Sequence, residues 1–166
     1  MHKTTIIPEH ELGLRHERLR AEMVALGIDM VLLDQPELIF HAIGYAMSEG
    51  FQQFCLIPAE GEIVMILRSV DRGTCLDYAP LPASTVIGYA DWDDPISILV
   101  EQIKARGMPH GRIAIDRDGY AMTLNRFEAV CDALPDTEWL DFSALLRDMR
   151  RLGRQYRIDI PYAGEF

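Results

Sequence analysis

Residues 51–68, FQQFCLIPAEGEIVMILR, decide the fold of this chain because they hold two apolar runs joined by a short polar turn. Residues 51–58 and 62–68 are typical of β-strands, and Ala59-Glu60-Gly61 supplies the glycine that a tight hairpin turn needs. The stretch therefore predicts two antiparallel strands in the middle of the chain.

Helices and strands alternate on both sides of this hairpin. The expected helices cover residues 8–26, 36–43, 70–78, 95–107, 124–134 and 143–152, and the other expected strands cover residues 30–33, 84–89, 112–115 and 138–140. Such alternation indicates an α/β fold with helices on both faces of the sheet. The hairpin makes the sheet mixed, with five to six strands. The core positions we expect are Leu19, Met23, Leu32, Ile66, Ile103, Ile113 and Phe127.

Length and charge limit the classes of protein. A chain of 166 residues suits one domain. Its formal net charge of −10 repels the phosphates of nucleic acids and of anionic membranes, so neither is an expected partner. The three cysteines are far apart and fit free thiols in a reducing compartment. No segment has the form of a signal peptide or a membrane span, so we expect a cytoplasmic protein.

No motif of a known catalytic or metal site is present, including GxGxxG, GxxxxGK[ST], HExxH and GxSxG. His10 and His16 lie six positions apart, on different faces of the first helix, and are expected to face solvent rather than share a metal. His41 is expected to be partly buried with a hydrogen-bond partner.

Two groups of aspartates have simpler interpretations than metal binding. Residues 116–119, DRDG, lack the later ligands of a calcium loop and predict a turn in which aspartate side chains bond local N–H groups. In residues 91–94, DWDD, Asp93 or Asp94 is expected to cap the helix that begins at Pro95. The arginines of residues 147–157 predict a solvated helix face, with an anion site as the alternative. The residues alone thus predict no catalytic side chain and no metal ligand.

Several short segments follow one another in an informative order. They are Arg15-His16-Glu17-Arg18-Leu19 with Gly27-Ile28-Asp29, then Val31-Leu32-Leu33 with Pro36-Glu37-Leu38-Ile39 and Gly44-Tyr45, then residues 54–58 with Ile66-Leu67-Arg68, then Arg112-Ile113-Ala114-Ile115-Asp116, and last residues 145–150. In order and spacing they resemble the N-terminal domain of the creatinase/prolidase family of Xaa-Pro peptidases. The resemblance covers residues 12–151, nearly the whole chain.

The resemblance implies a division of the chain and a role for it. Residues 1–151 would form the N-terminal domain, residues 152–166 depart from the family pattern, and the "pita-bread" catalytic domain would be absent. That domain holds divalent metal (manganese, cobalt or zinc) in the peptidase members, so no cofactor is expected here. The parent would be a hydrolase of C–N bonds, such as an Xaa-Pro peptidase, a creatinase or a related amidinohydrolase.

Within such a parent, the resemblance implies that this domain forms dimer contacts and walls the catalytic cleft. The expected partner is thus a second copy or a catalytic domain or subunit. Tyr45, Phe51, Arg68 and Asp71 are the candidate cleft-facing residues, with ordinary packing or surface roles as the alternative. The competing hypothesis is a free-standing small-ligand-binding or protein-interaction module that keeps this fold. A self-sufficient enzyme with a novel site has little support.

Overall fold

Six strands form one mixed sheet in a computed structural model that describes residues 6–45, 52–108 and 110–153. The strands are β1 (Met30–Leu33), β2 (Phe54–Pro58), β3 (Val64–Arg68), β4 (Val86–Tyr89), β5 (Arg112–Ile115) and β6 (Glu138–Asp141). Their order across the sheet is β4-β3-β2-β1-β5-β6. The predicted α/β fold with a mixed sheet is confirmed.

Among the described strands, only β2 runs against the direction of the others. β2 pairs antiparallel with both β1 and β3, whereas β1–β5, β3–β4 and β5–β6 pair in parallel. Five strands therefore point the same way, and their carboxyl ends share one edge of the sheet.

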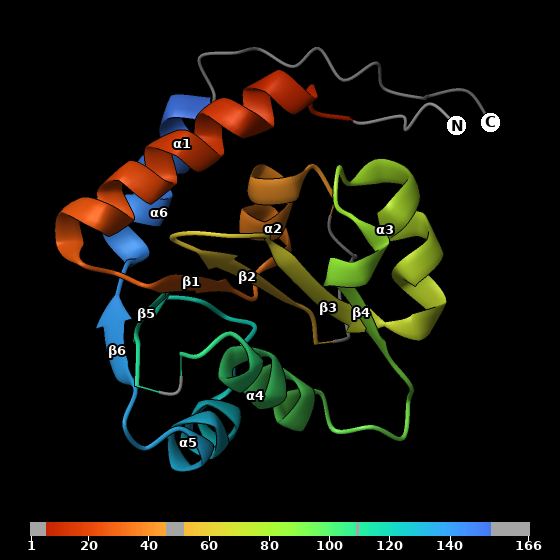
Figure 1. Cartoon of the computed structure of the whole chain (residues 1–166), viewed down its shortest axis with the longest axis vertical. Coiled ribbons are helices and arrows are strands. Elements are labelled where there is room, and N and C mark those ends of the chain that lie inside the picture. The colour runs from red at the N-terminus through yellow and green to blue at the C-terminus, as the bar shows by residue number, and fades with distance from the viewer. Residues whose placement is uncertain (1–5, 46–51, 109, 154–166) are drawn as a thin grey trace.

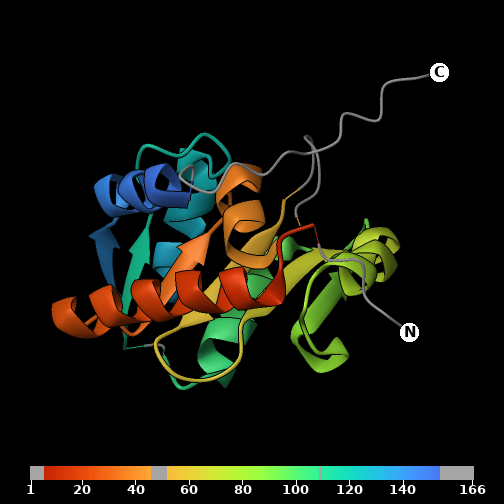
Figure 2. The same ribbon diagram turned by 90° about the horizontal axis from the view of Figure 1, so that it is seen from above.

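Helices cover both faces of the sheet (Figure 1). They are α1 (Glu9–Leu26), α2 (Pro36–Ile43), α3 (Arg72–Tyr78), α4 (Pro95–Ala105), α5 (Leu124–Ala133) and α6 (Ser143–Gly153), with 3-10 turns η1 (Ser69–Asp71) and η2 (Ala83–Thr85). Two apolar clusters divide them, because α1, α2, α3 and α6 pack on one face and α4 and α5 on the other. Figure 2 shows α2 lying between α1 and α6.

Alternation along each strand distributes its side chains between the two clusters. Met30 and Leu32 of β1 face α4 and α5, whereas Val31 and Leu33 face the other four helices. Both faces are covered, which explains why these strands read as continuous apolar runs.

The expected core is largely confirmed. Leu19, Met23, Leu32, Ile66, Ile103 and Ile113 are each at most 3 % exposed. Phe127 is half-buried and packs edge-on against Trp139, with ring centroids 5.4 Å apart.

Capping residues in the sequence predict the start of α4 correctly. Asp94 caps α4 by accepting from the N–H groups of Ile96 and Ser97 at 3.1 Å, and Thr123 caps α5. Ser143 is the first residue of α6 and does not cap it, because its hydroxyl donates to Asp141 and accepts from the N–H of Asp118. Among the described residues, no helix combines the length and apolar character that crossing a bilayer requires.

Candidate functional site

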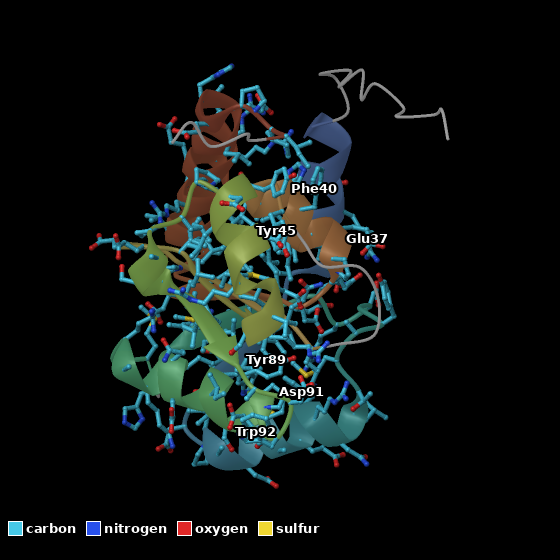
Figure 3. The ribbon with its side chains drawn as sticks, turned by 90° about the vertical axis from the view of Figure 1, so that its right-hand side faces the viewer. Glu37, Phe40, Tyr45, Tyr89, Asp91 and Trp92 are labelled. Carbon is cyan, nitrogen blue, oxygen red and sulfur yellow. The ribbon has the colours of Figure 1, made fainter. Side chains whose placement is uncertain are left out.

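The carboxyl edge of the sheet gathers most of the polar side chains that sequence reasoning singled out. In open α/β sheets, ligands bind in the crevices outside the carboxyl ends of the strands. Here the chain leaves β3 at Arg68, β4 toward Asp91 and β1 toward Asp34. Figure 3 is seen from the side where Tyr45, Tyr89, Asp91 and Trp92 lie.

An ion pair joins the ends of β3 and β4. The register places Arg68 directly beside Tyr89, two residues before Asp91. The guanidinium of Arg68 donates from Nε to Asp91 Oδ1 at 2.8 Å and from Nη2 to Oδ2 at 2.7 Å. This bidentate bond to Asp91 is the main cause that raises the pKa of Arg68. The pair fixes a planar charged fork at the edge of the sheet.

Two tyrosines lie in this region, Tyr89 beside Arg68 in the sheet and Tyr45 beside Asp71. The hydroxyl of Tyr89 donates to the main-chain oxygen of Gln52 at 2.6 Å and so links the end of β4 to the segment before β2. The hydroxyl oxygen of Tyr45 lies 3.5 Å from the main-chain oxygen of Asp71. Burial, with smaller contributions from Cys75 and Asp71, raises the pKa of Tyr45 to about 12. Tyr45 is therefore a neutral hydrogen-bonding group at physiological pH.

The structure thus brings three of the four candidate cleft residues into one region. Tyr45 is buried and touches Asp71, and Asp71 lies three residues beyond Arg68. Phe51 lies outside the described residues.

A second polar cluster lies at the same edge, beside the ends of β1 and β5, and sequence reasoning missed it. Asp34 is only 9 % exposed, and burial, reinforced by the nearby charge of Asp116, raises its pKa to about 6. Hydrogen bonds from its own N–H and that of Met122 partly oppose this rise. The neighbouring Gln35 donates to Asp116 Oδ2 at 2.7 Å. The sequence feature that could have predicted this cluster is Asp34, an aspartate placed directly after the apolar run of β1.

The expected turn after β5 is confirmed. Asp116 accepts from the N–H of Asp118 at 3.0 Å through Oδ1, and its main-chain oxygen accepts from Gly119. In the DWDD segment, Asp93 accepts from the N–H of Ala90 at 2.7 Å and Asp94 caps α4. Only Asp91 has a role that capping does not explain.

The expectation that His16 faces solvent is wrong. Its ring is half-buried, and Nε2 lies 2.6 Å from the carbonyl oxygen of Ala42. Burial, with the charges of Arg20 and Arg15, lowers the pKa of His16, so the ring is neutral and Nε2–H donates to Ala42. His41 is partly buried and paired with Arg15, as expected.

Within residues 6–45, 52–108 and 110–153, no three His, Cys, Asp or Glu side chains are grouped so that they could hold a metal ion. Cys55 and Cys75 are fully buried, and burial raises the pKa of Cys55, which suppresses its thiolate. The part of the carboxyl edge that remains accessible to polar groups includes the Arg68–Asp91 fork.

Comparison with known proteins places this arrangement in a family. The chain is 25 % identical over 154 residues to the creatinase of Bacillus sp. (strain B-0618), covering 92 % of this chain and 36 % of that enzyme. It is 23 % identical over 150 residues to the ectoine hydrolase of Halomonas elongata, covering 86 % and 38 %. The chain therefore spans less than two-fifths of the length of these two enzymes.

Solved structures share the fold. A proline dipeptidase from Streptococcus pneumoniae superposes with a TM-score of 0.71 at 15 % identity, covering 82 % of this chain and 97 % of that one. A prolidase from Thermococcus sibiricus gives 0.69 at 15 % identity, covering 81 % and 35 %. The family model for the creatinase/prolidase N-terminal domain matches residues 15–152. This chain belongs to the creatinase/prolidase N-terminal domain family.

Proposed function

We propose that residues 1–151 form an accessory domain of a larger C–N hydrolase, where they contribute dimer contacts and one wall of the substrate cleft. The observation that carries this proposal is the coverage: the chain matches 97 % of one solved chain but only 35 % to 38 % of longer relatives. A catalytic domain outside this chain performs the reaction.

The carboxyl edge supports the cleft-wall role. Arg68 and Asp91 hold a fixed charged fork there, and the buried Tyr45 and Tyr89 tie the neighbouring main chain in place through their hydroxyls. Groups held in this way can orient a polar substrate without losing much side-chain entropy. The substrate class is that of the relatives' names, which are proline dipeptides, creatine and ectoine.

In the proposal, the divalent metal of such a hydrolase is bound outside this domain. The described residues do not fit a catalytic manganese, cobalt or zinc ion, because they group no three suitable ligands. In the proposal any such metal belongs to the catalytic domain. The three free cysteines support placing the protein in the reducing cytoplasm.

A hydrolysis assay on the purified 166-residue chain tests the accessory role. Xaa-Pro dipeptides, creatine and ectoine are offered with and without added manganese, cobalt or zinc. We expect no turnover on any of them. Turnover that follows the protein through purification and disappears in Arg68→Gln would refute the accessory role. Light scattering during size-exclusion chromatography tests the dimer, and a monomer at all concentrations would remove that part of the proposal.

The second candidate function is a free-standing module that binds a small ligand. A groove on the opposite edge of the sheet favours it, and ligand binding there without turnover is its signature.

A further inference from the structure

A groove lies between the β2–β3 turn and the C-terminal end of α4. It is an open surface groove of about 430 Å³, and its walls include Glu60, Gly61 and Glu62 of the turn and Arg106 and Met108 beyond α4. This volume falls within the range of small-molecule sites, roughly 300–1,000 Å³. The groove lies where β3 and β4 begin, so the length of these strands separates it from the Arg68–Asp91 pair.

The turn that forms one wall is fixed from behind. Arg20 of α1 donates to the main-chain oxygens of Pro58 at 3.3 Å and of Gly61 at 2.6 Å. The N–H of Ala59 donates to the main-chain oxygen of Asp29 at 2.8 Å. The wall is therefore in place before any ligand arrives, and binding need not order it.

Arg106 supplies an incompletely bonded cation at the opposite wall. The side chain is half-buried, and its Nη1 donates to the main-chain oxygen and to Oε1 of Gln102 at 2.8 and 2.9 Å. Its Nε and Nη2 groups have no hydrogen-bond partner among the described residues. Burial lowers the pKa of Arg106, and the nearby Glu62 opposes this effect. A guanidinium fork with free parallel donors matches the two oxygens of a carboxylate.

The opposite charge lies on the turn. Glu60 and Glu62 are exposed, and neither forms an ion pair within 4 Å in the described part of the chain. A simple anion on Arg106 would be repelled by these two carboxylates and by the net charge of −10. A molecule that also carries a positive group turns this repulsion into attraction.

We propose that this groove binds a small zwitterion, an amino acid or a guanidino acid. Its carboxylate pairs with Nε and Nη2 of Arg106, and its ammonium or guanidinium group lies against Glu60 and Glu62. Met108 provides apolar contact for the linker between the two charged ends. The site is independent of the proposed cleft wall because the two lie at opposite edges of the sheet.

The test uses 4-guanidinobutyrate against its two halves, butyrate and propylguanidinium, with the whole 166-residue chain. Amide ¹H–¹⁵N spectra report where each probe binds. We expect the zwitterion to shift Gly61, Glu62 and Gly107 at millimolar concentration, and each half to bind at least about tenfold more weakly. Resonances of Asp91 and Trp92 are expected to stay in place.

Two variants and a control separate binding from folding. Arg106→Gln and Glu62→Gln should each weaken binding of the zwitterion about tenfold or more. Arg117→Gln, at an exposed arginine of the carboxyl edge, should leave it unchanged. Glu62 is exposed, so its variant reports on binding even if Arg106→Gln unfolds the end of α4. No shift at the groove, equal binding of all three probes, or binding that survives Glu62→Gln would overturn the proposal.

Discussion

Arg68 and Asp91 lie 23 residues apart in the sequence, yet they form a two-point ion pair where two neighbouring parallel strands end. Asp91 remains largely exposed, with 64 % of its side chain accessible. Because water screens an exposed pair and competes for its hydrogen bonds, the pair adds little to stability. Stability therefore does not account for its fixed geometry, which is what the proposed cleft-wall role requires.

Breaking this pair should therefore spare the fold. Arg68→Gln is expected to shift the Tm by no more than about 3 °C, because a partly solvated ion pair is nearly balanced by its desolvation and ordering. In the complete parent enzyme the same change should lower kcat/KM. Thermal denaturation and steady-state kinetics check the two parts. Asp132→Asn, at an exposed carboxylate of α5, is the control and should change neither. A large loss of Tm with normal kinetics would assign the pair a structural role.

Asp34 should make the protein less stable as the pH rises. Its folded pKa, about 6, lies above the ordinary value of 3.8, so the folded state favours the protonated carboxyl. This contribution is fully present below about pH 3.8 and is lost as the pH rises through 6, with a size of at most roughly 3 kcal/mol. Asp34→Asn should be more stable than wild type at pH 8 and lose that advantage near pH 4. Urea denaturation at both values measures the difference, and parallel curves for the two proteins would contradict the prediction.

His16 should have the opposite dependence at mildly acidic pH. Its pKa is lowered from 6.5, so the folded state favours the neutral ring that donates to Ala42. Stability from this group is present above pH 6.5 and is lost as the pH falls below it. An NMR titration of the His16 ring should give a midpoint below 6.5. His16→Gln should weaken the fall in stability on acidification, and His10→Gln, at an exposed position of the same helix, should not. A His16 midpoint at or above the ordinary value would show that the ring is not buried as described.

Gly88 should tolerate no side chain. A Cβ there would lie 2.9 Å from Ser69 Oγ and 3.1 Å from Ser69 Cα, so the backbone of η1 would have to move. Gly88→Ala should destabilise the protein by about 1–3 kcal/mol through this overlap. Gly73→Ala is the matched control, because nothing lies within 4 Å of its added Cβ and it sits in α3. That variant should be neutral or more stable by up to about 1 kcal/mol. Equal urea midpoints for both variants would mean that β4 and η1 are less closely packed than described.

Several features followed from the sequence because their causes are local. The hairpin turn, the apolar runs of β1 and β5 and the cap of α4 by Asp94 depend on residues within a few positions of one another. The family resemblance of residues 12–151 rests on the same short segments, and the family model matches residues 15–152. Mixed pairing also followed, because a tight hairpin forces antiparallel neighbours.

Other features depended on which distant segments meet. Helical spacing predicts a solvent-facing His16 because it cannot reveal that α2 packs over the ring. The Ala42 carbonyl that accepts the hydrogen bond from His16 lies 26 residues away. Asp34 and Asp116 influence each other because β5 lies beside β1 in the sheet, although the whole hairpin separates them in the chain.

The sequence by itself thus determined which segments form helices and strands, which of their apolar residues are buried, and the family of this protein. The tertiary structure alone decided the Arg68–Asp91 fork, the raised pKa of Asp34 and the groove around Arg106. The physical reason is that helix and strand formation depends on the spacing of apolar residues along the chain. The burial of a polar side chain and the charges beside it depend instead on which strands become neighbours in the sheet.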